Sequence, residues 1–199
     1  MEYKSLYEEF NIETKKMNKE YESLDEEFNI ETKKMYHRWF NKYIEDGKKD
    51  AFKNAVIAMG KTYNVLRTLP KQEENELNDI RENFFEDIWN NIPEIKSGKY
   101  DWTKEIEGIK GRHFWSYLSK VCYLISPEKY KIIYDSNNKT SLGKLYKKNK
   151  LNWNPEKWQE NIEEIFDDLV NKYQVELKNC KVDSPEYYFY LDFLLWESN

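Results

Sequence analysis

Residues 115–136 read WSYLSKVCYLISPEKYKIIYDS, and this stretch decides the fold class. Apolar side chains recur at three- and four-residue steps, which predicts a buried helix over residues 111–125. Ser126 and Pro127 then predict the start of a second helix, because Ser is a favoured N-cap and Pro fits the first helical turn. Residues 132–134 are short and extended, and Asp135 is a suitable N-cap for the element that follows.

Helical patterns continue on both sides of this stretch. The spacing of apolar residues predicts helices over 48–69, 72–91, 102–109, 139–148, 155–179 and 184–196. Pro93 and the Ser97-Gly98 pair predict a loop between two of them. No alternating run long enough for a sheet occurs. We therefore expect an all-α fold, with residues 46–199 forming a helical globular domain.

A direct repeat fills the N-terminal segment. The decamer EEFNIETKKM occupies residues 8–17 and recurs unchanged at 26–35, an offset of 18 residues. At about 3.6 residues per turn this offset is about five whole turns, so both copies project on the same side of one helix. Residues 1–45 are predicted to form a long helical arm with a narrow apolar stripe. The stripe could pair with a protein partner or a second copy as a coiled coil, or lie back on its own domain.

The charge of the chain is unevenly distributed. The net charge is −5, but residues 109–150 contain ten basic and two acidic residues between two acidic flanks. A basic segment of this kind favours a polyanionic partner. Pairing of this segment with the acidic flanks is an equally good explanation, and the sequence leaves both open.

Composition excludes several classes of protein. Aromatic residues make up 17% of the chain, which is too many for a disordered protein. The two cysteines and two histidines are not spaced as metal ligands, so we expect no metal and no cofactor. No signal peptide is visible, and no apolar stretch is long enough to cross a membrane. The expected location is therefore cytoplasmic.

The segment from Trp115 to Ser136 resembles the catalytic segment of the helix-hairpin-helix DNA glycosylases, in the 8-oxoguanine-glycosylase-like branch. In that family a Thr/Ser-Lys-Val sequence begins a buried helix, and an apolar stretch then ends in an Asp that caps the next helix. Here Ser119-Lys120-Val121 and Asp135 match this pattern. The resemblance is best over residues 112–142 and looser over 80–196. It implies a glycosylase-like helical body and DNA as the partner.

By this resemblance, Lys120 is a Schiff-base nucleophile and Asp135 is the essential carboxylate. The chemistry is consistent with these residue types. An amine that attacks a sugar C1′ must be neutral, and burial would lower the pKa of Lys120. A carboxylate at a helix N-terminus stays ionised and stabilises positive charge that develops on the sugar. Each residue also has a plain structural interpretation, with Lys120 on the surface and Asp135 only a helix cap.

A base removed from the DNA stack needs an aromatic-lined pocket. The candidate walls of that pocket are Trp115, Tyr117, Tyr123 and Tyr134. The candidate contacts to DNA phosphates are Arg112, Lys139, Lys144, Lys147 and Lys148. The same aromatics could be core residues, and the same lysines a solvated helix face.

Two hypotheses about function follow from these patterns. The first is a DNA-binding protein with DNA N-glycosylase/lyase activity. The second is a non-catalytic interaction or oligomerising factor on a degenerate glycosylase-like scaffold, for example in phage–host conflict, whose N-terminal helix binds a protein partner or a second subunit.

Overall fold

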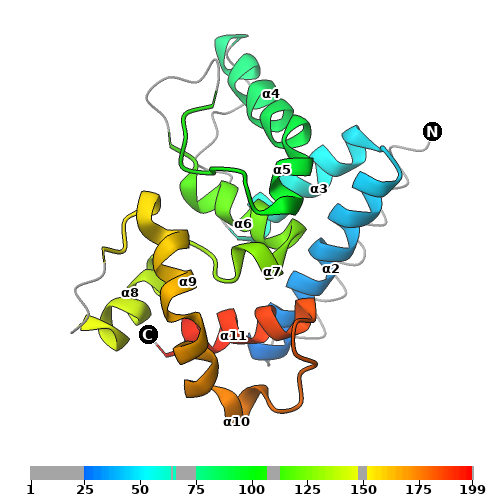
Figure 1. Ribbon diagram of the computed structural model, residues 1–199. Coiled ribbons are helices and arrows are strands. Elements are labelled where there is room, and N and C mark those ends of the chain that lie inside the picture. The colour runs from blue at the N-terminus through cyan, green and yellow to red at the C-terminus, as the bar shows by residue number, and fades with distance from the viewer. Residues whose placement is uncertain (1–24, 64, 66–74, 107–112, 148–151, 199) are drawn as a thin grey trace.

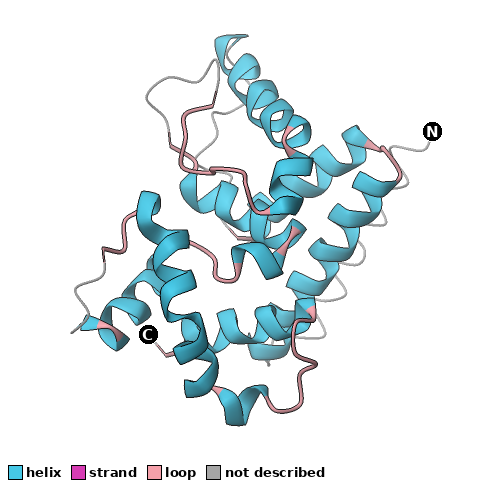
Figure 2. Ribbon diagram, in the orientation of Figure 1, coloured by secondary structure: helices cyan, strands magenta, loops and turns pink. Residues whose placement is uncertain are grey.

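The computed structural model describes residues 25–63, 65, 75–106, 113–147 and 152–198, and over these residues the fold is all-α with no strand (Figures 1 and 2). This confirms the predicted fold class. Within these ranges no helix has the length and apolar character needed to cross a membrane. The helices are α2 (Asp25–Glu45), α3 (Lys49–Thr62), α4 (Asn75–Asn90), α5 (Ile92–Ser97), α6 (Trp115–Ile125), α7 (Pro127–Tyr130), α8 (Ser136–Leu145), α9 (Pro155–Lys172), α10 (Gln174–Leu177) and α11 (Pro185–Glu197).

Helix α6 is the central element of the fold. Every residue from Tyr117 to Ile125 is buried, so this helix has no solvent-exposed face over that range. Helix α2 packs against α3, α6 and α11, and α11 also contacts α7 and α8 (Figure 1). A helix that is buried on all sides needs neighbours on all sides, which explains why the quoted stretch organises the chain.

The core is strongly aromatic, as the composition suggests. Phe84 lies against Phe85, Phe114 and Tyr117, with ring centroids 4.9–5.3 Å apart. Trp158 is fully buried and donates its indole N–H to the carbonyl of Ile132 at 3.1 Å. Edge-to-face and tilted arrangements dominate these contacts, which are the geometries that aromatic pairs prefer.

Three helices begin with a side-chain N-cap, among them the predicted cap at Asp135. Asp135, Asn154 and Ser184 each accept a hydrogen bond from a backbone N–H in the first turn, and Pro follows the cap in α9 and α11. The prediction for Ser126 is only half right. Helix α7 does begin at Pro127, but the hydroxyl of Ser126 donates to Glu128 Oε1 at 3.0 Å instead of capping the helix.

Several predicted boundaries are wrong. The loop predicted around Pro93 is the short helix α5, which ends at Gly98 in the left-handed conformation (φ 75°). Residues 102–106, predicted as the start of a helix, form a turn and a bend followed by irregular chain. The helix predicted over 155–179 ends at Lys172, and α10 follows it after Tyr173. Helix α8 begins directly after its Asp135 cap rather than at residue 139.

The described part of the N-terminal arm is helix α2, which ends at Glu45 and lies back on the helices that follow it. The buried face of α2 is broader than the predicted stripe and includes Thr32, Lys33, Tyr36 and Phe40. These side chains lie against α3, α6 and α11, and a helix with so wide a buried face cannot project into solvent. The first copy of the repeat lies outside the described residues.

Candidate functional site

A cleft of about 320 Å³ lies where four helices meet near the N-terminal end of α8. Helices α2, α6 and α11 contribute two lining residues each. The others come from the chain after α3 and from residues 133–137, which lead into α8. The described lining residues are Asn29, Lys33, Tyr63, Val65, Ser116, Lys120, Ile133, Asp135, Ser136, Asn137, Asp192 and Trp196. The volume is at the lower end of the range for ligand-binding clefts, and the lining is unusually rich in charge.

Lys120 and Asp135 face each other in this cleft. Lys120 is 5% exposed, and its Nζ lies 3.5 Å from Asp135 Oδ2 and 3.1 Å from Ser116 Oγ. The other carboxylate oxygen of Asp135 accepts the backbone N–H of Asn138 at 2.9 Å. One oxygen therefore caps α8 while the other faces the amine, so the cap fixes the carboxylate beside Lys120. The structure brings together the two residues that the sequence paired.

Burial lowers the pKa of Lys120, because a charged ammonium loses its hydration inside the protein. The negative charges of Asp135 and Asp192 raise the pKa in part, and the positive charge of Lys33 lowers it further. The balance is a lysine that loses its proton more readily than a surface lysine. Such an amine is a better nucleophile near neutral pH.

A second ion pair, Lys33 with Asp192, lies in the same cleft. Their Nζ and Oδ2 atoms are 2.7 Å apart, and the side chains are 3% and 4% exposed. Asp192 Oδ1 also accepts from the backbone N–H of Ile133 at 2.9 Å and from Asn138 Nδ2 at 2.8 Å. Asn138 in turn supplies the N–H that Asp135 caps. The pair thus links α2 and α11 to the turn that positions Asp135.

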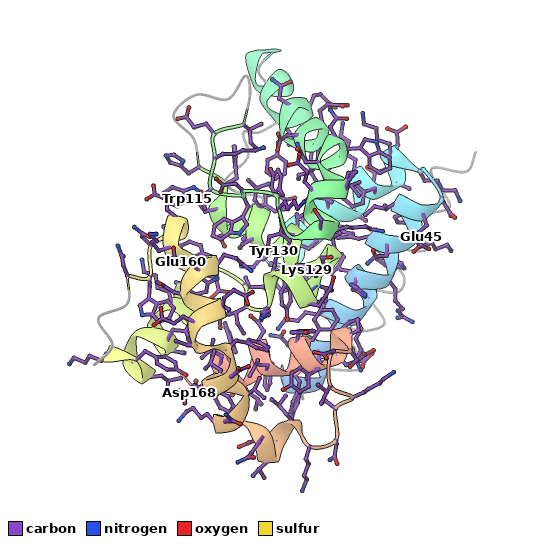
Figure 3. The ribbon with its side chains drawn as sticks, in the orientation of Figure 1. Glu45, Trp115, Lys129, Tyr130, Glu160 and Asp168 are labelled. Carbon is purple, nitrogen blue, oxygen red and sulfur yellow. The ribbon has the colours of Figure 1, made fainter. Side chains whose placement is uncertain are left out.

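The predicted base-pocket residues do not line the cleft. Tyr117 and Tyr123 are fully buried and donate to the carbonyls of Val56 and Tyr188, so they are core residues and the prediction is wrong for both. Tyr134 packs between Trp102 and Trp158. Trp115 lies at the start of α6, near the edge of the molecule in the view of Figure 3, where its ring stacks on that of His113.

The predicted phosphate contacts divide into two groups. Lys139, Lys144 and Lys147 are exposed on α8 or directly after it, on the helix whose N-terminus lines the cleft. Arg112 and Lys148 lie outside the described residues. Part of the basic segment is paired internally, because Lys131 contacts Glu163 of the acidic flank at 2.6 Å. Internal pairing therefore accounts for part of the basic segment.

Sequence reasoning missed most of the cleft. Asp192 had a signal, since it is the one acidic residue in the apolar run 187–196, and a lone carboxylate there needs a buried partner. Lys33, Asn29 and Tyr63 had none, because they belong to segments distant in sequence and match no motif. Among the described residues no cluster of three or more His, Cys, Asp or Glu side chains is placed to hold a metal ion.

No protein-family model, no curated protein and no solved structure matches this chain. The assignment of function therefore depends on the chemistry of the cleft.

Proposed function

We propose that this chain is a DNA-binding protein of the helix-hairpin-helix glycosylase type, with DNA N-glycosylase/lyase activity and Lys120 as the nucleophile. The observation that carries the proposal is a buried lysine facing a helix-capping carboxylate in a cleft. Structural lysines are seldom buried beside open space, because burial of the ammonium is costly unless it is fully paired. At 3.5 Å from a carboxylate that is 21% exposed, the Lys120 pairing is loose.

The proposed reaction begins with attack of Lys120 Nζ on C1′ of a nucleotide that has left the DNA stack. The new N–C1′ bond forms as the bond from C1′ to the base breaks, and the bonding electrons leave with the base, which is then protonated. Asp135 Oδ2 accepts the proton that Lys120 Nζ loses. The sugar ring then opens, O4′ takes up a proton and the C1′–N bond becomes an imine.

Asp135 also has an electrostatic role in this proposal. Positive charge develops on the sugar as the base departs, and an ionised carboxylate beside it stabilises that charge. Because its other oxygen is fixed by the cap of α8, the carboxylate needs no reorganisation as the charge develops. Phosphates of the bound strand are proposed to contact the exposed lysines on α8 or directly after it, which are Lys139, Lys144 and Lys147.

Borohydride trapping tests the proposal, because borohydride reduces the imine and leaves a stable covalent adduct. The substrates are duplexes that carry an abasic site, uracil or 8-oxoguanine. We expect an adduct with the natural chain and none with Lys120→Ala. The control is Lys96→Ala, which removes an exposed lysine of α5 and should retain the adduct. If no duplex gives an adduct, the lysine chemistry is refuted.

The salt dependence of binding tests the DNA partner separately. Loss of one phosphate contact lowers the slope of log affinity against log salt by about one. We expect that change for Lys144→Ala and Lys147→Ala, and no change for Lys96→Ala. If neither an adduct nor salt-dependent binding is found, the non-catalytic interaction factor becomes the better hypothesis.

A further inference from the structure

Two buried polar atoms of the cleft have no hydrogen-bond partner among the described residues. They are Asn29 Oδ1 on α2 and Tyr63 Oη at the end of α3. Nearly all buried polar atoms in proteins are paired, because an unpaired one has lost its hydration without compensation. Two of them lining one cleft indicate a site that is completed by a ligand.

The two atoms offer complementary hydrogen-bonding groups. Burial raises the pKa of the Tyr63 phenol well above its usual value, and the nearby charge of Asp192 raises it further. The phenol therefore keeps its proton and can donate. Asn29 Oδ1 is an acceptor. A ligand that carries one acceptor and one N–H donor could satisfy both atoms.

The same cleft presents one exposed aromatic ring. Trp196 on α11 is 37% exposed, whereas most aromatic side chains of the described residues are buried. A ring at the mouth of a cleft provides a surface on which a planar ligand can stack. A donor, an acceptor and a stacking face together match a nucleobase, whose edge has both kinds of hydrogen-bonding group and whose face is aromatic.

We propose that Asn29 and Tyr63 read the edge of the extrahelical base and that Trp196 stacks on its face. This inference rests on the proposed function, because it places the base in the cleft where Lys120 reaches the sugar. It also gives the second copy of the tandem repeat a role, since Asn29 and Lys33 both belong to that copy. The specificity-determining residues thus come from α2, α11 and the end of α3 rather than from the α6–α8 stretch.

The test compares binding to duplexes that differ at one bulged position. The bulge carries adenine, guanine, cytosine, thymine, uracil or an abasic sugar, and affinity is measured by titration. We expect the natural chain to bind at least one bulged base roughly tenfold more tightly than the abasic bulge. Asn29→Ala, Tyr63→Phe and Trp196→Ala should each reduce this preference by about fivefold or more.

Matched controls separate base reading from folding and from chemistry. Asn11→Ala changes the same residue in the first copy of the repeat and should leave the preference unchanged. The melting temperature of Tyr63→Phe should not fall, because the change removes a hydroxyl that has no partner among the described residues. Borohydride trapping on abasic DNA should persist in all three variants, since that substrate has no base to read.

The outcomes are distinct. Equal affinity of the natural chain for every bulge, or an undiminished preference in Asn29→Ala and Tyr63→Phe, overturns the inference. The inference is also overturned if the variants lose the preference for a bulged base and their melting temperatures fall as well, because the residues would then have a structural role only. Failure of abasic trapping in the natural chain instead refutes the proposed lysine chemistry, and the bulge comparison still decides whether the cleft reads a base.

Discussion

Replacing Lys33 with methionine removes one half of the buried Lys33–Asp192 pair and leaves the side-chain length almost unchanged. The carboxylate of Asp192 keeps two hydrogen bonds, from Ile133 N and Asn138 Nδ2, but loses its counterion at 2.7 Å. Breaking a buried pair in this way costs about 3–5 kcal/mol, because the remaining charge is uncompensated. Because Asp192 retains these two hydrogen bonds, we expect Lys33→Met to lower the free energy of unfolding by about 3 kcal/mol, the lower end of this range.

The partner change, Asp192→Asn, should cost a similar amount, because it leaves the Lys33 ammonium buried without a counterion. The double variant has no buried charge in this pair, so we expect it to lose only about 1–2 kcal/mol. The effects of the two single changes should therefore be far from additive. For a chain of this length, a loss of 3 kcal/mol lowers the melting temperature by roughly 6–12 °C.

Urea denaturation of the natural chain, the two single variants and the double variant measures the coupling energy between Lys33 and Asp192. Lys34→Met is the matched control, since Lys34 pairs with Glu31 at the same 2.7 Å distance but with side chains 30% and 36% exposed. An exposed pair of this kind contributes about 0.3–0.5 kcal/mol. The reasoning is refuted if Lys33→Met costs no more than Lys34→Met, or if the double variant loses the sum of the two single changes.

Three further predictions concern the cleft and the core. Lys120→Met should abolish the borohydride adduct and stabilise the fold by about 1 kcal/mol at neutral pH, as measured by urea denaturation, because a desolvated amine is removed. Because the pKa of Lys120 is lowered on folding, the unfolded chain binds the extra proton. The stability of the natural chain should therefore rise with pH from the folded-state pKa up to the ordinary value of 10.5, and this rise should be absent in Lys120→Met. Asp135→Asn should shift the pH midpoint of adduct formation downward, since the carboxylate raises the pKa of Lys120; an upward shift would contradict the assigned contact. Gly60→Ala should destabilise the chain by about 1–3 kcal/mol in thermal denaturation despite the better helix propensity of alanine, because the added Cβ would lie 2.7 Å from Cζ of Tyr117 and closer still to its Oη; an unchanged melting temperature would mean that this core is looser than described.

Local patterns were sufficient to predict the helical class and the positions of most helices. Asp135 was predicted as a cap from its residue type and the following sequence alone, and it caps α8. Helix α5 was missed because Pro93 was interpreted as a loop signal, although Pro is well tolerated in the first turn of a helix. Periodicity cannot distinguish these two uses of proline.

The candidate site was predictable only where its residues share one stretch of chain. Lys120 and Asp135 are 15 residues apart within the one stretch that resembles a known catalytic segment, whereas Lys33 and Asp192 are 159 residues apart and meet only through packing. The aromatic candidates failed for a different reason. Their residue type suits both a pocket and a core, and only packing decides between the two: Tyr117 and Tyr123 lie on faces of α6 that contact α3 and α11, where their hydroxyls donate to the carbonyls of Val56 and Tyr188.

The exact duplication of the decamer has a genetic consequence. Tandem copies recombine or slip during replication, so the gene should gain or lose units of 18 codons readily. Loss of the first unit leaves every position from Glu26 onward unchanged, and Asn29 and Lys33 therefore keep their distance along the chain from Lys120. Natural alleles are expected to differ in length at the N-terminus in steps of 18 residues, while the cleft is inherited intact.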